Sequence, residues 1–268
     1  MGRVTSRHKV VRIDLDGDVS RAIDTVACEE PLEIRVNGET FTVTMRTPGQ
    51  DIDLAHGLLR AEGVITERED VVSARFCSDL DTLNVVNFDV PAGRGDRAVT
   101  STRNLASLGG CGLCGTTAVE AIEAVVTRKP PEVLWEAEQV ATALSELHAR
   151  QAVFDKTGGV HGAGLVEAGG TRLGIVREDI GRHNAVDKVL GAALVTGVET
   201  AGSLLVVSSR ASFEIVQKAA VSGVAVLACV SAPSSLAIEA ADRLGVTLVA
   251  FARGRRMSAY THSHRIPH

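Results

Sequence analysis

The second half of the chain alternates short apolar segments with amphipathic ones. The apolar segments RLGIV, SLLVVSS, VAVLACVS and TLVAFA predict strands, and HNAVDKVLGAAL, FEIVQKAAVSG and SLAIEAADRLG between them predict helices. Buried strands joined by helices are typical of a mostly parallel sheet with helices on both faces. The pattern therefore predicts an α/β fold, with a three-layer α/β domain over residues 151–268.

The first half differs, because strand signals dominate it. The stretch PLEIRVNGETFTVTMRT alternates around Asn37 and Gly38, which is the strongest short signal for a β-hairpin. DIDLAHGLLRAEG predicts an amphipathic helix closed by Gly63, and VVSARF and TLNVVNFDV predict two further strands. We expect a smaller, strand-rich α+β domain over residues 1–150, which also holds a cysteine pair and the helices that follow it.

Composition limits the classes of function. The net charge is -5, so no overall positive field attracts nucleic acid or anionic lipid. The first residues, MGRVTSRHKV, lack the apolar stretch of a secretory signal, and the chain has no apolar run long enough to span a membrane. The five cysteines are mostly far apart, which argues for a reducing compartment. We expect a cytoplasmic protein that binds neither nucleic acid nor membrane, with Cys28, Cys77 and Cys229 as small buried residues.

Residues 109–115 read GGCGLCG, a cysteine pair three positions apart with glycine around both members. A capping box over residues 117–120 predicts that a helix begins directly after this loop. The positive end of a helix stabilises a thiolate, which is the reactive form of cysteine. The four glycines leave the sulfurs of Cys111 and Cys114 accessible. The pattern indicates a thiolate that meets two different partners, as a sulfur carrier must.

Other functions of a cysteine pair fit the sequence less well. A structural zinc site needs about four ligands; the chain has no second CxxC, and His262, His264 and His268 are a weak substitute, so we expect no metal. A thioredoxin-like redox pair should follow a buried strand, whereas RNLASLGG is polar. A zinc deaminase combines H-x-E with P-C-x-x-C, but residues 161–163 read HGA and no proline precedes the pair. Sulfur transfer is therefore favoured over redox cycling, and we do not expect deamination.

Three predicted strands end in residues that bind anions. Ligands of open parallel sheets bind beyond the carboxyl ends of the strands, and here those ends read SSR at 208–210, SAPSS at 231–235 and ARGRR at 252–256. Hydroxyls, free N–H groups and arginines are partners of phosphate oxygens. Any one end is more simply an ordinary helix cap or a solvated arginine. Three ends together predict a ligand that carries phosphate.

The segment REDIGRHNAVDKV, residues 177–189, places seven polar side chains at a turn from strand to helix, namely Glu178, Asp179, Arg182, His183, Asn184, Asp187 and Lys188. An ordinary helix start needs one cap, so we interpret the segment as part of a site. His183 has a second interpretation, as a core histidine bonded to a carboxylate.

Together these motifs resemble the formate dehydrogenase accessory sulfurtransferase family, FdhD. The resemblance covers nearly the whole chain in eight ordered segments, among them EPLEIRVNG, GGCGLCG, TGGVHGAGL, EDIGRHNAVDKV and FARGRR. It implies a protein that accepts sulfur as a cysteine persulfide from a cysteine desulfurase and passes it to the molybdenum cofactor, bis-molybdopterin guanine dinucleotide. The sulfurated cofactor then enters formate dehydrogenase. GDP is the expected mimic of one arm of that cofactor, and we expect a homodimer.

The resemblance also assigns residues. It implies that Cys111 carries the persulfide with Cys114 as its partner, and that residues 251–256 bind the cofactor. With the strand ends, the predicted cofactor site comprises Phe251, Ala252, Arg253, Gly254, Arg255, Arg256, Ser208, Ser209, Arg210, Ser234 and His183. The implied fold is deaminase-like with a smaller extra domain. One departure is Ser209, where we expect glycine in an S-G-R-x-S pattern.

Two classes of function remain open from the sequence. The first is a sulfurtransferase that uses Cys111. The second is a protein that transfers no sulfur, either a cofactor-binding chaperone with incidental cysteines or a thiol–disulfide oxidoreductase.

Overall fold

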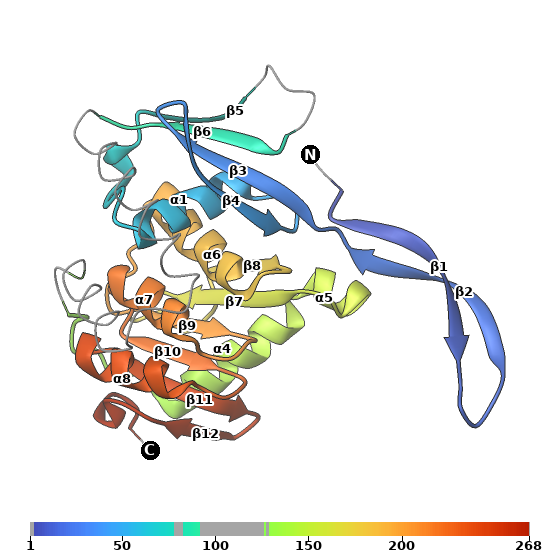
Figure 1. Ribbon diagram of the computed structural model, residues 1–268. Helices are drawn as coiled ribbons and strands as arrows, with labels where there is room; N and C mark the ends of the chain where they lie inside the picture. Colours follow the sequence, from blue (N-terminus) through green and yellow to red (C-terminus); the bar gives the residue numbers. More distant parts are fainter. Residues whose placement is uncertain (1–2, 78–82, 92–125, 127–128, 268) are drawn as a thin grey trace.

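A six-stranded sheet forms the centre of the larger part of the molecule (Figure 1). The computed structural model describes residues 3–77, 83–91, 126 and 129–267. The sheet runs in the order β12-β11-β10-β9-β7-β8. Its strands are β7 (His161–Val166), β8 (Ile175–Asp179), β9 (Leu204–Val207), β10 (Val226–Cys229), β11 (Thr247–Arg253) and β12 (Arg256–Ala259).

The strand directions correct the expectation of a mostly parallel sheet. β9, β10 and β11 pair in parallel, and β8 points the same way, as strands joined by helices should. However, β7 lies between β8 and β9 and is antiparallel to both, and β12 is antiparallel to β11. Both of these strands connect to a neighbour through a short turn, which permits only antiparallel pairing. The sheet is therefore mixed.

Helices cover both faces of this sheet, as the alternating pattern predicts. On one face, α6 (Arg182–Thr196), α7 (Phe213–Val221) and α8 (Ser235–Leu244) pack over a core rich in valine, leucine and alanine. On the other face, α4 (Ala137–Ala149) packs with Trp135 and Ile266. The domain boundary expected at residue 150 stays a prediction, as does the deaminase-like description; α4, which precedes that boundary, packs on the six-stranded sheet. No helix in the described part of the chain could cross a membrane.

The N-terminal half forms a smaller sheet with its own core. Its order is β4-β3-β6-β5, from β3 (Glu30–Val36), β4 (Glu39–Arg46), β5 (Ser73–Phe76) and β6 (Val85–Asp89). Asn37 and Gly38 both have positive φ, 53° and 86°, so the predicted hairpin turn is present. Helix α1 (Asp51–Ala61) packs on this sheet and ends before Gly63, and a 3-10 turn, η1 (Arg68–Asp70), leads to β5.

Helices α1 and α6 join the two sheets at unusually close range (Figure 1). A Cβ on Gly57 of α1 would overlap the Asp187 backbone, and a Cβ on Gly191 of α6 would overlap the Asp53 carbonyl. Both positions therefore require glycine, because any side chain would force the helices apart.

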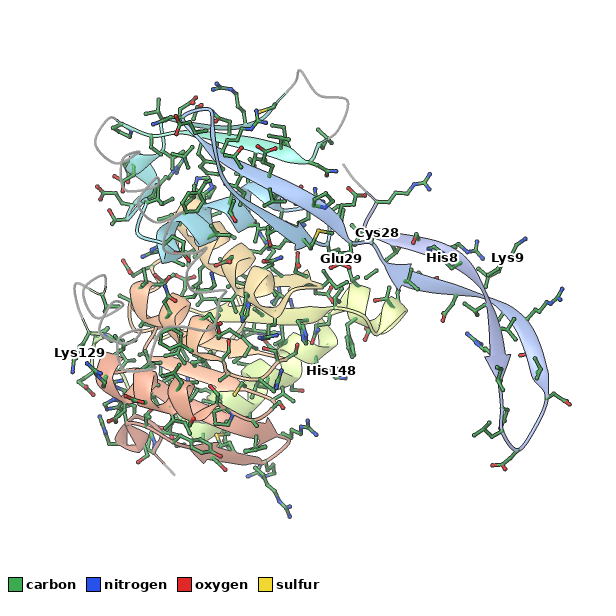
Figure 2. The ribbon with its side chains drawn as sticks, in the orientation of Figure 1. His8, Lys9, Cys28, Glu29, Lys129 and His148 are labelled. Atoms are coloured by element: carbon green, nitrogen blue, oxygen red, sulfur yellow. The ribbon has the colours of Figure 1, made fainter. Side chains whose placement is uncertain are left out.

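A long two-stranded arm, which the sequence analysis did not anticipate, projects from the body (Figure 1). It consists of β1 (Thr5–Ile13) and β2 (Val19–Ala27), and it joins the body beside Cys28 and Glu29 (Figure 2). The short helix α5 (Ala152–Thr157) contacts β2 at its base. The chain closes with a 3-10 turn, η2 (Ser263–Arg265).

A buried ion pair fastens the small sheet to the large one. Asp179 at the end of β8 and Lys188 in α6 are fully buried, with 2.7 Å between Oδ2 and Nζ. Both reach Thr47 in the loop after β4. Its N–H donates to the Asp179 carboxylate at 3.1 Å, and its carbonyl accepts from Lys188 Nζ at 2.8 Å. The pair therefore fixes a loop from the N-terminal half against the start of α6.

We expect Asp179→Asn to lower the free energy of unfolding by about 3 to 5 kcal/mol, because it leaves the Lys188 ammonium buried without its counter-charge. Urea unfolding measures this change. The exposed Arg172–Glu146 pair provides the control, since Arg172→Gln should change stability little. Equal and small effects of the two variants would show that the buried pair does not hold the halves together.

Candidate ligand site at the strand ends

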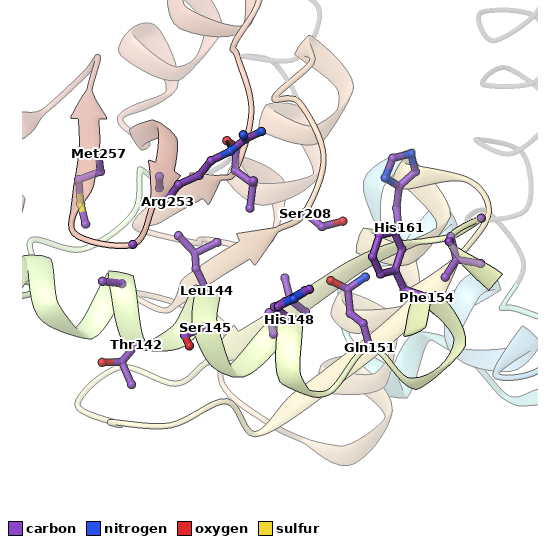
Figure 3. Close-up of a pocket in the computed structure, with 18 residues that line it drawn as sticks. Thr142, Leu144, Ser145, His148, Gln151, Phe154, His161, Ser208, Arg253 and Met257 are labelled. Carbon is purple, nitrogen blue, oxygen red and sulfur yellow. Dashed lines mark hydrogen bonds between the residues drawn. The ribbon is translucent and has the colours of Figure 1, made fainter. Parts of the chain in front are cut away.

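The parallel strands β9, β10 and β11 end at one edge of the large sheet, and two cavities open there. The larger measures about 890 Å³ and lies between α4 and the strand ends. Of the predicted cofactor site, it is lined by Ser208, Ala252, Arg253 and Gly254 (Figure 3). Most of its remaining wall is apolar, with Leu144, Leu147, Val160, Val230, Met257 and Phe154.

The smaller cavity measures about 290 Å³ and is cationic. It is lined by Arg182, Arg210, Ser212 and Ser234, with Ala211, Ala232 and Pro233 between them. Arg182 is the first residue of α6, and the two serines are the N-caps of α7 and α8, so three helix N-termini converge here. Within the described part of the chain, no Asp or Glu lines this cavity. Helix N-termini and arginines with no lining acid make a site for an anion.

Backbone contacts hold the walls of the smaller cavity together. The loops after β9 and β10 form an isolated parallel bridge between Ala211 and Pro233. Ala211 N–H donates to the Ala232 carbonyl at 3.2 Å, and Ser234 N–H donates to the Ala211 carbonyl at 3.1 Å. Ser234 Oγ accepts from Ala237 N–H and caps α8. The cavity is therefore built before any ligand arrives.

Two histidines near these cavities are uncharged at neutral pH. Burial, with Arg182 next in importance, lowers the pKa of His183 to about 4. Its Nε2 lies 3.0 Å from Ser212 Oγ and 3.7 Å from a Glu214 oxygen. Because the ring is neutral, the Glu214 contact is not an ion pair. Burial, and then the charges of Arg182 and Arg210, lower the pKa of His161 in the larger cavity. Both rings therefore serve as neutral hydrogen-bonding groups.

Five of the predicted cofactor residues line neither cavity, and four of them are Phe251, Arg255, Arg256 and His183. Phe251 is half exposed, with φ at 49°, and lies in a bulge of β11. Bulges re-aim side chains, and here Ala252 turns inward while Phe251 turns out. Arg255 is exposed and lies 3.6 Å from Glu138, and Arg256 begins β12 on the surface. His183 stands behind the smaller cavity, against Ser212.

Ser209 is the fifth predicted residue outside the cavities. It is buried, and its Oγ donates to the Arg210 carbonyl at 3.0 Å. Its φ is not among the positive values found at non-glycine residues of the described chain, so serine needs no strained backbone here. The expected glycine is therefore not required by the local geometry.

The five cysteines fall into three groups. Cys111 and Cys114 lie outside the described residues. Cys229 is buried as expected, and burial raises the pKa of its thiol to about 12, which makes it unreactive. Cys28 and Cys77 are partly exposed, contrary to the expectation that both are buried. Cys28 lies at the base of the arm and Cys77 directly after β5, and both are near the protein surface.

The polar segment 177–189 is chiefly a structural network. The Glu178 carboxylate accepts from the N–H groups of Val153 and Phe154, and it so anchors α5. Asp187 pairs with Lys218 at 2.8 Å, although burial raises the pKa of this aspartate to about 6. Arg182 is the member of the segment that lines one of the two cavities. The polar groups therefore serve packing more than ligand binding.

Sequence reasoning missed several cavity residues. Gln151, His161 and Phe154 line the larger cavity, and Ser212 lines the smaller one. Arg182 also lines the smaller cavity, and it belongs to the segment 177–189 that the sequence indicated as part of a site. Gln151 follows a helix and precedes a short one, so nothing in its local sequence indicates a cavity.

Relatives of this chain are recognisable over its whole length. A model of the FdhD/NarQ family matches residues 27–267. The chain is 50% identical to the "Sulfur carrier protein FdhD" of Nocardia farcinica, over 99% of this chain and 96% of that protein. It is 46% identical to the protein of that name in Streptomyces avermitilis, over 99% and 97%.

A solved structure shares the fold. It is that of a formate dehydrogenase accessory protein from Desulfotalea psychrophila, with a TM-score of 0.79 and 24% identity, and the match covers 99% of this chain and 100% of that one. The family match and the identities together show that the chain belongs to the FdhD/NarQ family.

Proposed function

We propose that this protein is a sulfur carrier that holds sulfur as a persulfide on Cys111. It takes the sulfur from a cysteine desulfurase and passes it to bis-molybdopterin guanine dinucleotide before this cofactor enters formate dehydrogenase. The names of the relatives, sulfur carrier proteins, support the carrier role. We place the reaction in the cytoplasm and propose a homodimer.

The cationic cavity is the observation that carries the cofactor part of this proposal. Arg182 Nε is buried there with no hydrogen-bond partner among the described residues. A buried donor without a partner is costly, and a phosphate oxygen would satisfy it. Arg210 and Ser234 supply further donors at the same place. A ligand with a diphosphate, such as the nucleotide arm of the cofactor, suits this cavity.

The proposed sulfur transfer has two steps, loading and delivery. In loading, the Cys111 thiolate attacks the terminal sulfur of the desulfurase persulfide, an S–S bond forms on Cys111, and the desulfurase cysteine leaves as a thiolate. In delivery, the Cys114 thiolate attacks the Cys111 sulfur, which releases the terminal sulfur as hydrosulfide and forms a Cys111–Cys114 disulfide. Two equivalents of a cellular thiol then reduce this disulfide to Cys111 and Cys114 thiols and are themselves oxidised to a disulfide.

A second candidate is a cofactor-binding chaperone without sulfur transfer. The cavities would serve it equally well, because no cysteine of the described part of the chain lines either of them. The two candidates differ in what Cys111→Ala does. A chaperone keeps full activity in this variant, whereas a sulfur carrier loses activity while its cofactor binding stays intact.

We expect wild-type protein incubated with a cysteine desulfurase and cysteine to gain about 32 Da, the mass of one sulfur atom, in intact-protein mass spectrometry. Cys111→Ala should lose this adduct. Cys114→Ala should still load some sulfur but support less formate dehydrogenase activity. The control is the double variant Cys28→Ser, Cys77→Ser, which removes the partly exposed thiols and should load normally. An adduct that persists without Cys111 would place the persulfide elsewhere.

We expect Arg210→Gln to weaken the binding of GDP about tenfold, because it removes a charge-assisted hydrogen bond to phosphate. The loss should shrink at high salt, since this arginine is exposed. Calorimetry at two salt concentrations measures both effects. Arg172→Gln is the matched control, because Arg172 lies in the connection between β7 and β8, at the opposite end of the sheet. Identical losses in both variants would indicate a general effect of charge and no phosphate site.

A further inference from the structure

The larger cavity is lined by a glutamine whose buried amide nitrogen has no hydrogen-bond partner among the described residues. Gln151 lies at the junction of α4 and α5 and is only 3% exposed. Its Nε2 has no hydrogen-bond partner among the residues that the structure describes. The backbone around it is fixed, because Gln151 N–H donates to the His148 carbonyl and its own carbonyl accepts from Asp155 N–H. An ordered, buried amide without a partner is expected where a ligand completes the hydrogen bonding.

Gly162 in β7 leaves room for the Gln151 side chain. A Cβ on Gly162 would lie 2.6 Å from the Gln151 amide carbon, so a residue larger than glycine would displace the amide. Gly162 N–H donates to Ser208 Oγ at 2.9 Å, which leaves the Ser208 hydroxyl proton free to donate to a ligand. The neutral ring of His161 lines the same cavity (Figure 3). Gln151, His161 and Ser208 therefore present neutral hydrogen-bonding groups together.

The remaining wall limits what can bind between these groups. Among the described residues, no Asp or Glu lines the cavity, so no carboxylate is present there to accept from a ligand's amino groups. This lining favours a ligand with ring carbonyl oxygens over one with amino groups alone. Apolar side chains, including Phe154 and Leu147, form the surfaces around the amide, and these suit the faces of a flat ring.

The dimensions fit a ring joined to a longer group. Thr142, Ser145 and His148 line the cavity in sequence along α4, and Gln151 follows just beyond the end of this helix (Figure 3). With a rise of about 1.5 Å per helical residue, the three positions in α4 alone span about 9 Å. Arg253 lines the cavity too, and Figure 3 shows it away from the Gln151 end. The cavity thus has a neutral end and a cationic one.

We propose that Gln151 is a specificity-determining residue that binds the lactam edge of a neutral heterocycle in this cavity. A carboxamide offers one donor and one acceptor side by side, which pair with the adjacent C=O and N–H of a lactam. The 2-amino-4-oxopyrimidine ring has this edge, and it is common to guanine and to pterins. The inference rests on the proposed function, because it assigns a ring of the proposed ligand to a place in the protein.

The test compares Gln151→Met with Gln217→Met, a matched change in α7 on the other face of the sheet. Calorimetry uses GDP, ADP, a pterin without phosphate, and inorganic pyrophosphate. We expect Gln151→Met to weaken GDP, the pterin or both about tenfold, and to leave pyrophosphate binding unchanged. A loss with GDP alone identifies guanine as the source of the ring, and a loss with the pterin alone identifies the pterin. A loss with both identifies their shared edge.

Unchanged binding of both GDP and the pterin by folded Gln151→Met would overturn the inference. Should this variant fold poorly, the wild-type protein provides a second measurement. The side-chain amide NMR signals of Gln151 should shift on addition of GDP or the pterin and stay in place with pyrophosphate; no shift with either ring would equally overturn the inference. The persulfide on Cys111 is measured separately by mass, so the carrier function and the ring site can fail independently.

Discussion

The buried ion pair between Asp179 and Lys188 holds the two sheets in one arrangement, and the candidate site depends on it. The pair is fully buried, and it forms hydrogen bonds with the N–H and the carbonyl of Thr47. The Asp179 carboxylate also accepts from Gly181 N–H at 2.8 Å and so orders the turn into α6. Arg182 is the next residue and lines the cationic cavity. The Asp179–Lys188 pair therefore both holds the small sheet against the large one and positions Arg182 at the cationic cavity.

The two cavities at the edge of the large sheet differ in polarity. Ser208 faces the larger, mostly apolar cavity, whereas Arg210, two residues later, faces the small cationic one. The loops after β9 and β10 separate the two and are tied to each other at Ala211 and Pro233. A ligand with a neutral ring and a charged phosphate group matches this division. Each part meets an environment that disfavours the other.

Much of the fold follows from local patterns, and the site follows in part. The apolar runs of β9, β10 and β11 and the Asn37–Gly38 turn are visible in the sequence because burial and positive φ restrict residue choice. Ser208 and Arg210 could be predicted because parallel strands end at one edge. β7 could not, since two glycines weaken its strand signal. The role of Gln151 arises from contact with Gly162, which only tertiary packing creates.

The most direct test of the account follows labelled sulfur from the protein to the cofactor. Protein loaded with ³⁵S by a desulfurase is separated from that enzyme and mixed with the molybdenum cofactor in a single turnover. The account predicts that label moves to the cofactor, that excess GDP slows this transfer, and that Cys111→Ala transfers none. Label that stays on the protein while the cofactor is bound would contradict it.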